Sequence, residues 1–455
     1  MSNPGPSPDP VAAPLTPARH DPYAVLRNRD LVFYLIGRFV SSLGQQMLTV
    51  AVGWELYERT HSPLHLGLVG LTQMVPMVLF TLPAGHLADN INRKRIIILT
   101  TLLLAGASLG LTLISALGAQ VIWIYFCLFV AGSARTFLWP ASSAFLPHLV
   151  SRKDFSKAVT WSSGSFQLSS VLGPAAGGLL IALTHHAAPV YAVNTAASLI
   201  CLALIACVRR THTVAAREPM TLRGLLVGFR FVFASPIILG TITLDLFAVL
   251  LGGATALLPI YAKDILHNVP VGLGFLQTEL LRWFNLRVDM AALRLGLLQA
   301  SLPLGSLVCA LVLAHRPPMQ KAGRAMLTAV ALFGIATIGF GFSQWFWVSF
   351  LMLFISGVVD NVSVVVRHTL VQLLTPDEKR GRVSAVNSLF IGTSNELGGF
   401  ESGFVAQIFG PAVGNAIATG AIISVVSGGV GTLLVVLAVA AIWPQIRHFG
   451  RLDAG

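Results

Sequence analysis

The stretch "GHLADNINRKRIIIL", residues 85–99, places one acid, two asparagines and three consecutive bases between two long apolar runs. The runs cover about 66–88 and 96–116. Each is long enough to cross a bilayer, since a membrane helix needs about 20 apolar residues. A short charged connection between two such runs predicts a helical hairpin whose turn lies at a membrane surface.

The composition of the whole chain favours a membrane protein. Of its 455 residues, 55% are hydrophobic and only 11% are charged, whereas soluble domains carry about 25% charged residues. The apolar runs are continuous and do not alternate with a period of two, so they predict helices and exclude an outer-membrane barrel. We therefore predict an all-α membrane protein.

The apolar runs predict twelve transmembrane helices in two six-helix bundles that repeat one another. The spans are expected at about 31–54, 66–88, 96–116, 121–146, 158–183, 189–208, 236–261, 295–314, 323–342, 345–372, 383–409 and 421–443. The predicted domains are a disordered cytosolic tail at 1–30, an N-terminal bundle at 31–208, an amphipathic cytosolic linker at 209–235, a C-terminal bundle at 236–443 and a cytosolic tail at 444–455.

An internal repeat relates the two halves. "VSRKDFSKAVTWSS" at 150–163 resembles "LTPDEKRGRVSAVNS" at 374–388, and "LYERTHS" aligns with "IYAKDIL" so that Tyr57 matches Tyr261. A repeat of this size predicts two structurally similar bundles.

The second half carries an apparent insertion. "LGFLQT" at 273–278 recurs as "LGLLQA" at 295–300, which places the insertion at about 277–294. Its amphipathic, basic sequence predicts a segment on the outer membrane face or a short re-entrant piece. Because the flanks repeat, we expect the insertion to be dispensable for folding.

The distribution of bases predicts the orientation. Most of the 30 Lys and Arg residues lie at the N-terminus, in the linker, or in connections on the same side as the N-terminus. The positive-inside rule then makes both termini cytosolic in a multi-pass protein of the cell inner membrane. The net charge of +12 follows from this topology, and no contiguous basic domain suggests nucleic-acid binding.

The opening stretch resembles a signature of the major facilitator superfamily, Gly-x-Leu-Ala-Asp-x-x-Gly-Arg-Lys between helices 2 and 3. Asn92 replaces the second glycine and is expected to tolerate a left-handed backbone. The resemblance implies that Asp89 latches an outward-facing state against a helix N-terminus, while the bases are expected to anchor the loop to anionic lipid. The matching gating-loop residues include Gly85, Asp89, Arg93 and Lys94.

Two further stretches carry the resemblance. "LGPAAGG" at 172–178 is similar to the helix-5 element of the antiporter branch of this family, and it matches at Gly173, Pro174, Gly177 and Gly178. Helix packing alone explains these glycines equally well. "FLWPASSAFLPHLV" at 137–150 and the stretch 370–403 resemble the exporter subgroup that includes the enterobactin exporter.

Charged residues inside spans predict functional positions, because burial of a charge in the bilayer is costly. Asp245 has no base within two turns on its own helix, so we predict that it is the main proton carrier, with Glu396 as the second candidate. Asp360 is the third proton-coupling candidate, but it is expected to stay ionised beside Arg135 and Arg367 and to act mainly in structure or substrate binding. The cavity or substrate candidates are Arg38, Gln45, Arg135, Arg367 and Asn395, with Arg38 and Gln45 on one polar stripe of the first span.

These features predict a secondary transporter that exports a small amphipathic molecule (a siderophore, drug or metabolite) by alternating access, driven by protons. No phosphate-binding loop is found, so ATP is not the direct energy source. The alternatives are a proton-coupled uptake symporter and, more distantly, a non-transporting membrane sensor or a membrane enzyme. The expected partners are the substrate, protons and membrane lipid. We expect a monomer with no cofactor, metal or nucleic acid.

Overall fold

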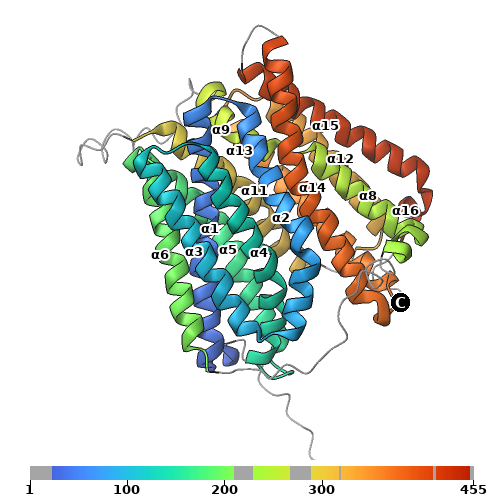
Figure 1. The fold of residues 1–455 in the computed structure, drawn as a ribbon. Helices are drawn as coiled ribbons and strands as arrows, with labels where there is room; N and C mark the ends of the chain where they lie inside the picture. Colours follow the sequence, from blue (N-terminus) through green and yellow to red (C-terminus); the bar gives the residue numbers. More distant parts are fainter. Residues whose placement is uncertain (1–22, 210–228, 267–287, 317–318, 413–416, 451–455) are drawn as a thin grey trace, which may run out of the picture.

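A computed structural model describes residues 23–209, 229–266, 288–316, 319–412 and 417–450. Within these ranges the chain is almost entirely helical and contains no strand. The predicted tail over 1–22, most of the predicted linker, and the part of the predicted insertion up to residue 287 lie outside the described residues. The prediction of an all-α membrane fold with two six-helix bundles is confirmed (Figure 1).

The N-terminal bundle begins after a short 3-10 turn, η1 (Ala24–Arg27), and three of its six helices show clear caps of two kinds. The Asn28 side chain accepts hydrogen bonds from the first backbone N–H groups of α1, and His61 and His185 end α1 and α5 in the left-handed conformation. The helices are α1 (Arg29–Thr60), α2 (Pro63–Asn90), α3 (Arg93–Leu117), α4 (Ile122–Leu149), α5 (Phe155–Thr184) and α6 (Ala188–Cys207).

The C-terminal bundle starts with a broken span. α8 (Pro236–Leu251) ends at Gly252, and the chain continues through η2 (Ala254–Leu257), α9 (Leu258–Ile260) and a π-helical turn, η3 (Tyr261–Ile265). A Cβ atom on Gly253 would lie 2.3 Å from the Gly398 carbonyl oxygen, so the break lies against α14. The remaining helices are α11 (Met290–Ala314), α12 (Ala322–Phe342), α13 (Phe346–Leu374), α14 (Asp377–Ala412), α15 (Ile417–Ile442) and α16 (Pro444–His448).

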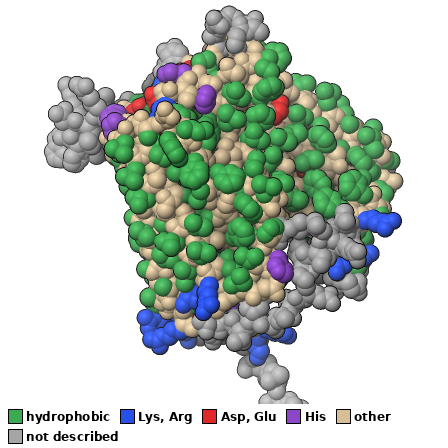
Figure 2. Space-filling model, viewed as in Figure 1, with side chains coloured by type: hydrophobic (Ala, Val, Ile, Leu, Met, Phe, Trp, Pro, Cys, Tyr) green, Lys and Arg blue, Asp and Glu red, His purple; other side chains and the backbone are tan. Residues whose placement is uncertain are grey.

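The surface of the molecule suits a bilayer. Apolar side chains cover the flank in view, and Lys and Arg side chains gather toward one end (Figure 2). We call this end, where α1 begins and α3 begins, the basic end, and the opposite end, where α1 ends, the gate end. Ten described helical segments are long and apolar enough to span a membrane. α1 and α14 are long enough but more polar, and both contribute polar side chains to the interior.

The two bundles meet along α2 with α14 and α5 with α11 (Figure 1). Glycines make these crossings close. A Cβ on Gly178 would lie 2.6 Å from the Gly296 Cα, and a Cβ on Gly403 would lie 2.8 Å from the Gly67 Cα. Both crossings lie toward the gate end, so the bundles are packed backbone to backbone there.

Candidate functional site

A cavity of about 380 Å³ lies between the bundles, in the half of the molecule nearer the gate end. Apolar side chains and neutral amides or hydroxyls form most of its wall. Its only charged lining residues among the described part of the chain are Arg135 and Glu396. Its neutral polar lining includes Gln46, Thr49, Gln73, Ser170, Thr255, Gln299 and Asn395.

Arg135 and Glu396 come from different bundles. α4 carries Arg135, whose Nη2 donates a 2.6 Å hydrogen bond to Gln73 Oε1 on α2, while its buried Nε has no hydrogen-bond partner. α14 carries Glu396 and Asn395, and the Asn395 amide donates to the Ile391 carbonyl at 2.9 Å. Arg135 and Glu396 interact electrostatically across the interface. Opposite charges on the two bundles therefore meet in one cavity.

On α1 the structure confirms one residue of the predicted polar stripe, Thr49, as a cavity residue but not Gln45. Gln45 Nε2 donates to Asn194 Oδ1 on α6 at 3.4 Å, so this side chain points into the N-terminal bundle. Gln46 lines the cavity instead and donates to Ser170 Oγ at 3.0 Å. Successive residues of a helix point about 100° apart, and two adjacent glutamines left the phase ambiguous. Arg38 lies half-buried nearer the basic end.

The structure corrects the predicted charge pairs of the C-terminal bundle. Arg367 on α13 forms an ion pair with Asp245 on α8, and both side chains are buried. The expectation that Asp245 lacks a basic partner considered only its own helix, and the partner comes from another. Arg367 was expected to pair with Asp360. Instead it is bound in an ion pair with Asp245 within one bundle.

Asp360 lies on the same face of α13 as Leu353, a cavity residue, and Arg367. The spacing of seven residues between neighbours makes this a single stripe that runs from the cavity toward the basic end. Arg135, its predicted partner, points to Gln73 in the N-terminal bundle. The similar depth of Arg135 and Asp360 in the repeat therefore does not bring them together.

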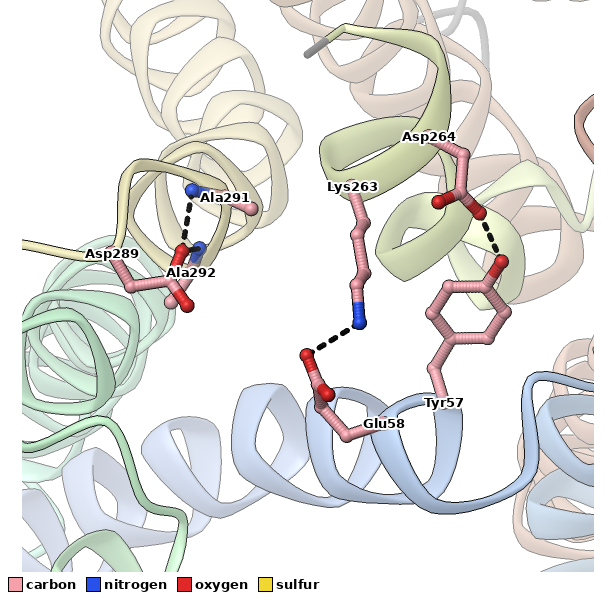
Figure 3. A network of polar contacts seen from close by, with 7 residues as sticks. All are labelled: Tyr57, Glu58, Lys263, Asp264, Asp289, Ala291 and Ala292. Atoms are coloured by element: carbon pink, nitrogen blue, oxygen red, sulfur yellow. Dashed lines mark hydrogen bonds and ion pairs between the residues drawn. The ribbon is translucent and has the colours of Figure 1, made fainter.

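A polar network joins the bundles at the gate end (Figure 3). The Tyr57 hydroxyl on α1 donates to the Asp264 carboxylate on η3. The adjacent Glu58 accepts from Lys263 Nζ at 2.6 Å, and Lys263 also lies over the rings of Trp54 and Tyr57. In the sequence Tyr57 is recognisable only as a repeat position, because the network joins segments about 200 residues apart and has no local signal.

Two further polar contacts between the bundles lie at the same end. Ser62 Oγ is 2.9 Å from Gln407 Oε1, and the Asp289 amide donates to the Ala182 carbonyl at 2.9 Å. Another hydrogen bond between bundles, from Gln167 to Pro303, lies nearer the middle. The described polar contacts between bundles are thus concentrated at the gate end, and we conclude that this end is closed.

The helix-5 motif serves two interfaces. Cβ atoms on Gly173 and Gly177 would meet α1 at Gln46 and Met47, whereas a Cβ on Gly178 would meet α11 at Gly296. Pro174 lines the cavity. The motif therefore packs helices within one bundle and also closes the contact between bundles.

The opening loop is held by contacts inside the protein. Arg93 donates to the carbonyls of Ala88 and Ala144, both at 3.3 Å, and contacts His148. Lys94 Nζ donates to the Ala206 and Val208 carbonyls at 2.9 and 2.6 Å.

These two bases therefore bind helix C-termini, where a cation is favourable, and the expected contact of the loop with anionic lipid stays a prediction. Asn92 is the N-cap of α3 at φ −57°, not a left-handed residue. Gly85 lies within α2, and the Asp89 side chain lies outside the described residues, so the predicted latch stays a prediction.

The predicted insertion ends earlier than expected. Residues 290–294 form the first turn of α11, which Asp289 caps by accepting from the Ala291 and Ala292 amides (Figure 3). The Ala292 carbonyl lies 2.7 Å from the Cβ position of Gly178. These residues are therefore part of the interface between the bundles.

Proteins of known function share sequence with this chain along most of its length. The enterobactin exporter EntS of Escherichia coli (strain K12) is 25% identical over 415 residues, which cover 91% of this chain and 92% of that protein. EntS of Shigella flexneri is 25% identical over 419 residues, with the same coverage of 91% and 92%.

Solved structures show the same fold at lower identity. A bacterial homolog of the human lysosomal transporter Spinster, in an inward-facing and occupied conformation, superposes with a TM-score of 0.69 at 15% identity and covers 94% of this chain and 98% of its own. The nucleoside transporter NupG gives a TM-score of 0.67 at 13% identity, covering 91% and 98%. The model of the Major Facilitator Superfamily matches residues 34–394, and the chain belongs to this family of membrane transporters.

Proposed function

We propose that this transporter exports a small amphipathic molecule across the cell inner membrane by alternating access, in exchange for protons. The observation that carries the proposal is the cavity between the bundles, whose two charged residues, Arg135 and Glu396, come one from each bundle. The relatives named as enterobactin exporters support export. The substrate is not inferred from their name.

In the proposed orientation the basic end faces the cytosol, as the positive-inside rule requires. The contacts between Glu58 and Lys263 and between Tyr57 and Asp264 then close the outer side. In this proposal, the closed gate end corresponds to the state of the transporter that loads substrate from the cytosol. Export requires that these contacts break and that the bundles rock the other way around the cavity.

We assign the coupling proton to Glu396 instead of Asp245. Asp245 is neutralised by Arg367 inside one bundle, so its protonation would not change a contact between bundles. Glu396 faces Arg135 across the interface. Protonation of Glu396 removes this attraction between the bundles, and a change in charge at such a position biases the two-state equilibrium of the transporter.

Uptake by proton symport uses the same fold and remains the alternative. A compound-sensitivity screen of a deletion strain would identify transported compounds, and transport into inverted membrane vesicles with and without a pH gradient would give the direction. Accumulation inside inverted vesicles that requires an acidic lumen supports export. Gradient-driven movement out of the vesicles would contradict it.

A further inference from the structure

The cavity wall pairs a side chain that can only donate hydrogen bonds with one that, when ionised, can only accept them. The Arg135 guanidinium carries donors alone, and an ionised Glu396 carries acceptors alone. The two formal charges sum to zero, and every other described lining residue is uncharged. A ligand that touches both residues must therefore offer an acceptor to one and a donor to the other.

Arg135 is short of acceptors in the described structure. One of its N–H groups binds Gln73 at 2.6 Å, but its buried Nε has no partner. A buried donor without a partner costs about 1–3 kcal/mol. Among the described residues no direct ion pair joins Arg135 to Glu396, so a ligand group has a place beside this guanidinium.

We propose that the substrate presents to this pair an uncharged group with adjacent acceptor and donor atoms, such as a carboxamide, whose carbonyl binds Arg135 and whose N–H binds Glu396. This inference rests on the proposed function and names the substrate class of the same site. A carboxylate would satisfy Arg135 but is repelled by an ionised Glu396, and an ammonium group would bind Glu396 but is repelled by Arg135.

The neutral lining supports the same class of ligand. Gln46, Gln299 and Asn395 are themselves amides, which both donate and accept, and the remaining wall is largely apolar. An uncharged amide with an apolar body loses less hydration free energy on entering such a cavity than an ion does. The volume of about 380 Å³ accommodates a small amphipathic molecule of this type.

The arrangement also links ligand and proton. A ligand N–H bound to Glu396 favours the ionised carboxylate, so ligand and proton compete for the same residue. By reciprocity the proton weakens ligand binding by the same factor. Such competition is what an exchange of substrate for protons requires, whereas a carboxylate ligand would favour the protonated acid and lead to symport.

The test compares three probes that share one apolar body: hydrocinnamide, hydrocinnamate and phenylpropylamine. Binding to the purified full-length protein in lipid nanodiscs is measured by thermal stabilisation up to millimolar concentration. Proton release is measured in lightly buffered solution across a series of pH values. We expect hydrocinnamide to stabilise the protein most and to release protons, with an affinity at least about tenfold above those of the two ions.

Variants test which residues are responsible for the binding of hydrocinnamide and for the proton release. Glu396→Gln should abolish proton release by hydrocinnamide, Arg135→Gln should weaken its binding about tenfold, and Asp154→Asn, a surface acid at the basic end, should change neither. The proposal is overturned if hydrocinnamate or phenylpropylamine binds as well as hydrocinnamide, if hydrocinnamide does not stabilise the protein, or if Glu396→Gln keeps full proton release. Amide binding with proton release but no gradient-driven transport in vesicles would contradict only the proposed function.

Discussion

Lys263 Nζ lies 2.6 Å from Glu58 Oε1, and the two side chains belong to different bundles. Their segments, around Tyr57 and Tyr261, are the ones that the predicted sequence repeat aligns. The pseudo-symmetry of the fold therefore brings equivalent segments face to face at the gate end. Since both side chains are partly exposed, the pair stabilises the closed gate only modestly.

Neutralising this pair should open the gate end. An exposed ion pair contributes about 0.2–1 kcal/mol, so Glu58→Gln should raise the open population by at most about fivefold. We would measure the reaction of a Thr49→Cys variant, lacking the four native cysteines, with an impermeant maleimide added to intact cells. The exchange Glu58→Lys with Lys263→Glu should restore protection. Equal labelling with and without Glu58→Gln would contradict a gating role.

The glycine crossing should be sensitive to a single methyl group. A Cβ on Gly296 would lie 2.6 Å from the Pro174 carbonyl oxygen, and overpacking of this kind costs about 1–3 kcal/mol. Gly296→Ala should therefore disfavour the closed gate and increase labelling of Thr49→Cys. Gly164→Ala is the matched control, because its Cβ would meet nothing within 4 Å. A Gly296→Ala protein that labels like this control would contradict close packing at the crossing.

The pair of Asp245 and Arg367 should matter for stability. Removing one partner of a buried ion pair costs about 3–5 kcal/mol, so Asp245→Asn and Arg367→Met should each lower the melting temperature. Replacing both by Asp245→Leu and Arg367→Met should recover most of the loss, because no unpaired charge stays buried. Thermal unfolding in detergent checks this. An Asp245→Asn protein of unchanged stability that has lost gradient-driven transport would return the proton site to α8.

Lys94 and Arg95 should differ in their contribution to thermal stability although they are neighbours in the sequence. Lys94 binds the carbonyls of Ala206 and Val208 at the end of α6, whereas Arg95 is exposed. Lys94→Met should lower the free energy of unfolding by about 0.5–1.5 kcal/mol, the usual net contribution of a hydrogen bond, because one of its two bonds is exposed to solvent. Arg95→Gln should leave stability unchanged. Thermal stability measured in neutral and in anionic lipid separates contacts inside the protein from contacts with lipid. An equal effect of both variants would contradict the assignment of Lys94 to the end of α6.

The helices and the family could be predicted from the sequence because their signals are local. Continuous apolar runs determine the spans, and the opening loop has fixed spacing between Gly85 and Lys94. The start of α11 is different. The apolar run predicts a start at 295, but the helix begins at Met290, because Asp289 caps it and Ala292 packs on α5. Such a boundary depends on a partner helix that the local sequence does not show.

The site could be predicted only in part. Arg135, Glu396 and Asn395 were singled out as charged or polar residues inside spans, and the structure places all three on the cavity wall. The partner of Arg367 could not be predicted because it lies on α8, a helix distant in the sequence. Gln46 was missed because hydrophobic periodicity cannot fix the phase of two adjacent polar residues.

The most direct test of proton-coupled export through Glu396 uses inverted membrane vesicles with a respiration-driven acidic lumen. A compound identified by the deletion-strain screen is added outside, and lumen acidity and compound uptake are followed together. We predict that the wild-type protein and Asp154→Asn take up the compound while protons leave the lumen, and that Glu396→Gln does neither. Full proton exit with Glu396→Gln, or compound and protons moving in the same direction in the wild type, would contradict it.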